Sequence, residues 1–168
     1  MKRHFIALIL AFAGFISLHA ATVSVLVVEA GFLSGTGRTQ SAAVWESGIM
    51  DVLFDAGHIV FNAPILRIPA APGNPAAPDS QIPLQARRDF DEARLGGAEF
   101  FVMVLLLFPE GGPEHPREIR MKIFSVSTGK LLYESSVIAK PWEDSGEELA
   151  DAKKSAERLI PQLVHRGS

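Results

Sequence analysis

Residues 31–39 (GFLSGTGRT) are the segment of this chain that most invites a chemical interpretation, because glycines stand beside hydroxyl side chains and a basic residue. A phosphate-binding loop needs glycine, four residues, then Gly-Lys-Ser/Thr, so that backbone N–H groups surround the phosphate and the lysine reaches it. Here Phe32 stands at the first glycine position and Arg38 replaces the lysine. The spacing therefore favours a flexible glycine connector over a nucleotide site, and we expect no cofactor.

Histidine, cysteine and serine side chains form no catalytic or metal-binding pattern. Beyond the first twenty residues the chain has three histidines, His58, His115 and His165, and their spacing is not that of metal ligands. The sequence has no cysteine, which excludes disulfides, thiolate metal sites and cysteine nucleophiles. No serine lies in a Gly-x-Ser-x-Gly motif. We therefore expect no metal, no catalytic residue and no enzymatic activity.

Three large apolar side chains suit a binding role instead. Phe32 and Leu33 follow the first expected strand, and open α/β sheets place their ligands at the carboxyl ends of their strands. Trp142 follows Pro141 just after the last expected strand. We name Phe32, Leu33 and Trp142 as candidate partner-binding residues. The alternative is that all three fold back and cover the edge of the core.

The amino terminus has the three parts of a secretory signal peptide. It begins with Lys2 and Arg3, continues with an uncharged apolar run over residues 5–18, and reaches small residues at Ala20 and Ala21. The run has only about 14 residues, whereas a membrane-spanning helix needs about 20. We expect residues 1–20 to be a signal peptide that is cleaved after Ala20 or Ala21, and the protein to be periplasmic or otherwise exported. Without a cysteine, the usual lipid anchor is excluded.

Charge excludes two further kinds of partner. Removal of Lys2 and Arg3 with the signal lowers the net charge from −3 to −5, because no acidic residue leaves with them. An acidic chain without a basic cluster is poorly suited to nucleic acid or anionic lipid, and we expect to find neither as a partner. The remaining residues, 21–168, have the length of one domain with a core of its own.

Apolar periodicity predicts a single three-layer α/β domain of element order β-α-β-α-β-β-β-α, with a mixed sheet and helices on both faces. The first strands should be parallel, because a strand, a helix and a strand joined by short links form a right-handed crossover. The last two strands should form an antiparallel hairpin. The expected strands cover residues 22–29, 58–62, 99–108, 118–123 and 131–139, and the expected helices cover residues 40–56, 84–95 and a segment starting at Ser145.

Some positions in this fold can be assigned from side-chain type. Trp45 lies on the apolar stripe of the first helix and should be core. The strand of residues 99–108 is apolar throughout, which is typical of the middle of a sheet. Residues 63–83 contain six prolines and are expected to form an extended, mobile loop rather than a domain boundary. Ser145 and Glu148 have the spacing of a capping box at the start of the last helix.

Charged residues are expected on the surface. Glu118, Arg120 and Lys122 alternate with apolar residues, which predicts one solvated face for that strand. Glu147 and Glu148 fall in the first turn of the last helix, where the helix dipole favours acidic side chains.

Short motifs resemble those of a group of bacterial envelope proteins. Residues 97–102 (GAEFFV) are similar to a helix-to-strand signature of that group, residues 127–133 (STGKLLY) to its hairpin, and residues 52–61 to a second helix-to-strand step. The group includes the penicillin-binding-protein activator LpoB, the curli secretion protein CsgG, the flagellar protein FlgO and the amino-terminal domain of TolB. The resemblance covers residues 23–140 and implies the fold and the envelope compartment, but not a partner. Tyr133 stands where a tryptophan is common in the group.

These observations favour an exported cell-envelope protein that acts as a protein-docking or assembly module, similar to a peptidoglycan-synthase activator or an appendage-assembly component. Its partner would be another envelope protein. A small-ligand or glycan-binding periplasmic domain remains the main alternative, and it would use residues 31–37 and the proline-rich loop. An unrecognised hydrolase is a third possibility.

Overall fold

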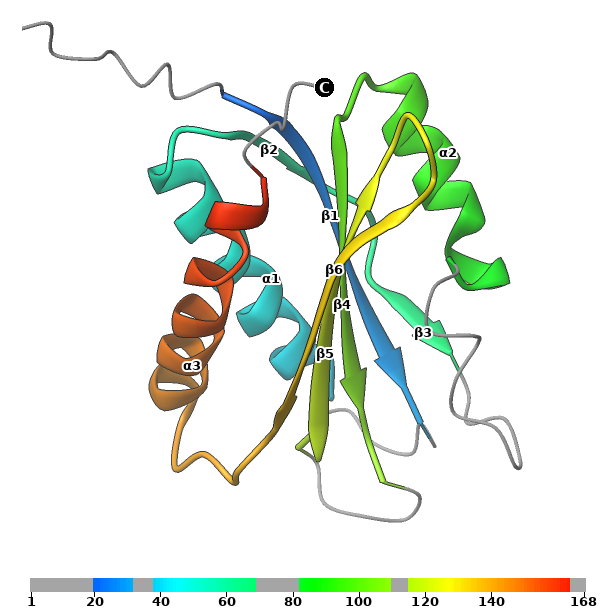
Figure 1. Ribbon diagram of the computed structural model, residues 1–168. Coiled ribbons are helices and arrows are strands. Elements are labelled where there is room, and N and C mark those ends of the chain that lie inside the picture. Colours follow the sequence, from blue (N-terminus) through cyan, green and yellow to red (C-terminus); the bar gives the residue numbers. More distant parts are fainter. Residues whose placement is uncertain (1–19, 32–37, 69–81, 110–114, 164–168) are drawn as a thin grey trace, which may run out of the picture.

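The computed structural model describes residues 20–31, 38–68, 82–109 and 115–163. Figure 1 shows a mixed β-sheet viewed edge-on, with helices α1 and α3 on one face and helix α2 on the other. The strand order is β2-β1-β4-β5-β6, and β3 also pairs with β1. This arrangement confirms the expected three-layer α/β fold with parallel first strands and a carboxyl-terminal hairpin.

The structure gives the following bounds. The strands are β1 (Thr22–Ala30), β2 (Ile59–Asn62), β3 (Leu66–Ile68), β4 (Phe100–Leu107), β5 (Glu118–Ser125) and β6 (Leu131–Ile138). The helices are α1 (Arg38–Asp55), α2 (Arg87–Leu95) and α3 (Ser145–Glu157), with short 3-10 turns η1 (Leu84–Ala86) and η2 (Ile160–Gln162).

The centre of the sheet is the parallel pair of β1 and β4, whose apolar side chains are buried on both faces. Val25 pairs with Val102 and packs in the core beneath α1 and α3, where Trp45 is only 1% exposed. The next residue along β1, Leu26, packs on the other face, towards α2. Continuous apolar sequence is therefore explained by burial on both sides, and the expected positions of residues 99–108 and Trp45 are confirmed.

The edge of the sheet beyond β1 is an interrupted strand. Val25 pairs with Asn62 in β2, whereas Val28 pairs with Leu66 in β3, so the edge strand holds one residue more than β1 between these two positions. Pro64 lies in that interruption, where its missing N–H breaks no ladder hydrogen bond. Part of the expected proline-rich loop is therefore strand, and residues 69–81 lie outside the described residues.

The β5–β6 hairpin turns where expected, with Gly129 at φ 67°. One residue of the expected solvated face is buried, however. Lys122 is 4% exposed, and its Nζ lies 3.2 Å from Glu134 Oε1 on β6. The cross-strand carboxylate supplies the opposite charge that a buried lysine requires.

Helix α3 packs along α1, and glycine allows the close approach. A Cβ atom added at Gly48 would lie 2.9 Å from the Ala152 side chain. One expectation about the start of α3 was wrong. The N-cap is Asp144, not Ser145, because Asp144 Oδ1 accepts the Glu147 N–H at 2.9 Å. At its other end α3 stops at Glu157, and Pro161 lies beyond it in η2.

Candidate interaction site around Trp142

The structure places one of the three predicted partner-binding residues. Trp142 lies in the connection between β6 and α3, half-buried, and packs against the core. Phe32 and Leu33 fall outside the described residues. Trp142 and its surroundings are therefore the part of the candidate site that the structure describes.

Trp142 is held by one aromatic contact and one hydrogen bond. Its ring centroid lies 6.3 Å from that of Trp45, with the two planes tilted by 55°. Its Nε1 donates to Oδ2 of Asp151, a residue of α3, at 2.9 Å. The indole is thus fixed at both its ring and its polar atom while part of its surface stays exposed.

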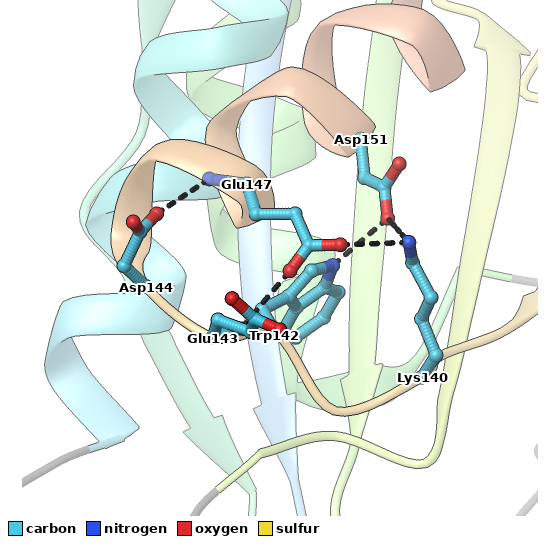
Figure 2. Close-up of polar contacts among 6 residues, drawn as sticks. All are labelled: Lys140, Trp142, Glu143, Asp144, Glu147 and Asp151. Carbon is cyan, nitrogen blue, oxygen red and sulfur yellow. Dashed lines mark hydrogen bonds and ion pairs between the residues drawn. The ribbon is translucent and has the colours of Figure 1, made fainter.

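Charged side chains lie beside the indole (Figure 2). Lys140 Nζ lies 2.8 Å from Glu147 Oε1 and 4.0 Å from Asp151 Oδ2. The hydrogen bond from Lys140 lowers the pKa of Glu147, and the same contact raises the pKa of Lys140. Both groups are therefore charged at neutral pH, and the rim of the site carries one cation among carboxylates.

The backbone of this turn is fixed by the start of α3. Glu147 Oε2 accepts the Glu143 N–H at 3.0 Å, and Asp144 accepts the N–H of Glu147. These two contacts satisfy backbone donors at the helix start, as a capping box does, although the pair is one residue earlier than the sequence suggested. The indole is consequently carried by a turn with little freedom.

A buried carboxyl group lies beneath the two indoles. Glu148 is 7% exposed, and its Oε1 accepts the Trp45 Nε1–H at 3.1 Å. Burial raises the pKa of Glu148, while hydrogen bonds with Ser41 and Trp45 and the charge of His115 oppose that rise. We expected Glu148 on the surface, and this was wrong. The Trp45 bond joins α1 to α3, so Glu148 serves packing and has no exposed face for a substrate.

A second buried carboxylate lies at the carboxyl end of β1. Glu29 is 0% exposed, and its Oε2 lies 2.9 Å from Arg67 Nε on β3. Its other oxygen, Oε1, is buried without a hydrogen-bond partner. The sequence pattern indicates Glu29 only as the end of a strand. The available signal was the alternation of Arg67 with Leu66 and Ile68, which is typical of a short strand. The structure pairs that strand with β1 and so brings Arg67 beside Glu29.

The described residues hold neither a metal-binding cluster nor a membrane-spanning helix. No three histidine or acidic side chains there lie close enough together to bind a metal ion. Within the same residues, no helix combines the length and the apolar character needed to cross a membrane.

Comparison with known proteins gives structural neighbours only. No protein-family model matches the chain, and no curated protein sequence matches it. A variant of the PelC dodecamer from Paraburkholderia phytofirmans has a TM-score of 0.52 at 16% identity, over 85% of this chain and 89% of that one. The PelC dodecamer from the same organism in another crystal form gives 0.50 at 17% identity, over 88% and 90%. Lipoprotein GNA1162 from Neisseria meningitidis gives 0.44 at 16% identity, over 83% and 99%. At these identities the likeness concerns the fold.

Proposed function

We propose that this chain is exported to the cell envelope and acts there by docking onto another envelope protein, without catalysing a reaction. The observation that carries the proposal is the fixed, partly exposed indole of Trp142. Protein interfaces concentrate their binding energy in a few aromatic anchors, and tryptophan is enriched among them. An anchor already held in position loses little conformational entropy when it binds.

The surroundings of Trp142 have the composition of an interface. The partly exposed indole lies beside Lys140, Glu147 and Asp151, and the contacts of Lys140 with the two carboxylates hold these charges in place. Ordered rim charges select a partner by charge pattern and exclude water around the anchor. The buried Glu148 and Trp45 beneath support the indole.

The comparisons support an assembly role at the level of the fold. The PelC structures are dodecamers, so a domain of this fold can build contacts with other chains. The motif resemblance to LpoB, CsgG, FlgO and TolB favours the same compartment. On this basis the partner would be a peptidoglycan synthase or a component of a surface-appendage assembly.

The test is capture of the partner by matched variants. The purified protein is immobilised, envelope extract from the native host is passed over it, and captured proteins are identified by mass spectrometry. Binding of the purified partner is then measured directly. Trp142→Ala should weaken binding by about 1–3 kcal/mol. Leu95→Ala is the control, because Leu95 is an apolar side chain, 86% exposed, on α2 at the opposite face of the sheet.

Thermal stability is measured on the same variants, since Trp142 also packs on Trp45. A loss of binding that is fully explained by a smaller folded fraction would contradict the proposal. Equal binding by Trp142→Ala and the wild type would also contradict it.

A further inference from the structure

Strand β6 forms an open edge of the sheet (Figure 1). Its eight residues pair with β5 on one side, and no other strand of the described residues pairs with it. Among the described residues, the backbone groups of residues 133–138 make no hydrogen bond outside the β5–β6 ladder. An edge strand of this length with unpaired N–H and C=O groups is a template for another strand.

The opposite edge of the sheet, in contrast, is protected against pairing with another strand. There, β2 has four residues and β3 has three, with Pro64 and an extra residue between them. Short strands, bulges and proline are the features that prevent edge-to-edge pairing. Strand β6 contains no proline, and its register shift lies at its start, opposite Ile123 and Phe124.

The hydrogen bonds to β5 determine which groups of β6 point outwards. The Ala139 N–H donates to the Arg117 carbonyl at 2.9 Å, so this is a hydrogen-bonded pair of the antiparallel ladder. Such pairs alternate along a ladder. Ser135 and Val137 therefore bond to β5, whereas Glu134, Ser136 and Ile138 direct their N–H and C=O groups to the open edge.

We propose that two copies of this chain pair antiparallel through β6, about a two-fold axis at Ser135, and form one continuous sheet. In this register Leu132 lies opposite Ile138 of the second copy, and Glu134 lies opposite Ser136. Leu132 and Ile138 are 49% and 84% exposed apolar side chains, so their pairing removes apolar surface from water. The outward-directed residues face one another, which is what ladder hydrogen bonds require.

The charge of Glu134 selects this register over its neighbours. A shift of the axis by one residue towards Leu131 places Glu134 opposite its own copy, and like charges directly opposite destabilise a sheet. A shift the other way places Glu134 opposite Ile138, which leaves an apolar side chain against a carboxylate. The axis at Ser135 avoids both.

The Ser135 hydroxyl gives an independent indication. Its Oγ is buried without a hydrogen-bond partner, although it lies in the middle of the strand. At the proposed axis the two Ser135 residues form a directly opposed, non-hydrogen-bonded pair, and a rotation about Cα–Cβ brings one hydroxyl to the other. This pairing does not depend on the docking function proposed above, because it needs only the chain itself.

The first test is the mass of the purified protein by analytical ultracentrifugation from about 1 to about 100 µM, the range of moderate self-association. We expect a monomer–dimer equilibrium. Ile138→Lys should weaken the dimer tenfold or more. Leu95→Lys, equally exposed at 86% but on α2, should leave it unchanged. Ser136→Pro, which removes an outward N–H, should weaken it more than Ser136→Ala.

The second test fixes the register by crosslinking, which the absence of native cysteine makes simple. In Ser135→Cys the two Cα atoms would lie about 4.5 Å apart, within the range for a disulfide. In Ser136→Cys they would be diagonal neighbours about 7–8 Å apart, beyond that range. We expect rapid crosslinking of the first variant only.

Any of three results would overturn the proposal. The first is a protein that stays monomeric throughout the range, and the second is equal crosslinking of the two cysteine variants. A dimer that Ile138→Lys leaves intact would also overturn it. All variants are first checked for the wild-type circular dichroism spectrum. Because the measurements use the purified protein alone, their failure leaves docking onto a different envelope protein unaffected.

Discussion

Replacement of Trp45 by phenylalanine tests the polar contact that joins α1 to α3. The variant keeps an aromatic ring in the core but loses the Nε1–H that donates to Glu148 Oε1 at 3.1 Å. A buried acceptor left without its donor costs about 1–3 kcal/mol, and the smaller ring leaves a cavity worth about 1 kcal/mol more. We expect the free energy of unfolding to fall by about 2–4 kcal/mol.

Urea unfolding followed by circular dichroism measures this loss, and Trp142→Phe is the matched control. Trp142 also donates its Nε1–H to a carboxylate, Asp151, but it is only partly buried, so water can replace the lost partner. The control should cost about 1 kcal/mol or less. Equal losses in the two variants would refute the idea that the Trp45 bond is special because it is buried.

The dependence on pH identifies Glu148 as the partner. Burial raises the pKa of Glu148 above its ordinary 4.5, so the folded state binds the proton more tightly than the unfolded state does. The resulting stabilisation is present at low pH and is lost as pH rises from about 4.5 through the raised pKa. Trp45→Phe removes a hydrogen bond that lowers this pKa, so its cost should be larger at pH 8 than at pH 4. Glu148→Gln should abolish that difference, and a cost independent of pH in the single variant would exclude Glu148.

Three further predictions concern the amino-terminal half. Sequencing of the protein from its native host should begin at Ala21 or Thr22, and a chain that still begins at residue 1 would contradict export with cleavage. Gly31→Ala should cost more in urea unfolding than Gly57→Ala: both glycines have positive φ, but only at Gly31 would a Cβ lie 2.6 Å from a backbone oxygen at the end of β4. Burial lowers the pKa of His58, whose Nδ1 accepts the Ala21 N–H at 3.2 Å, so stability should be full above pH 6.5 and fall below it. His58→Gln should remove this fall, and an unchanged pH profile would show that another group titrates.

The main elements could be predicted because each has an apolar pattern that is longer than the error in placing the ends of the element. β1 and β4 are continuous apolar runs, and α1 has the 3–4 residue spacing of a buried stripe. β3 could not be predicted with equal ease, because three residues between prolines carry too little periodicity. It exists because Leu66 packs beside Val28 while Arg67 reaches the buried Glu29, a contact between segments far apart in sequence.

The start of α3 shows why the polar side of the candidate site was predicted only in part. Two overlapping patterns fit a helix start, Ser145 with Glu148 and Asp144 with Glu147. Successive residues in a helix differ in direction by about 100°, so a shift of one residue decides which glutamate faces α1. The structure uses Asp144, which directs Glu147 to Lys140 and buries Glu148 against Trp45. The sequence contained both patterns, and only packing against α1 decides between them.

The two proposed surfaces lie next to each other along the chain, and this makes their independence testable. Pairing about Ser135 would bring the β5–β6 turn of the second copy towards the segment that follows Ile138, and Trp142 lies only four residues further on. If the surfaces are separate, Ile138→Lys should abolish self-association and leave partner binding unchanged, while Trp142→Ala should do the reverse. If self-association builds the docking surface, Ile138→Lys should weaken partner binding as well. At a given protein concentration, partner binding should then fall by the same factor as dimer formation. Binding measured above and below the dimer dissociation constant separates these cases, because only a shared surface makes the affinity for the partner depend on the concentration of this chain.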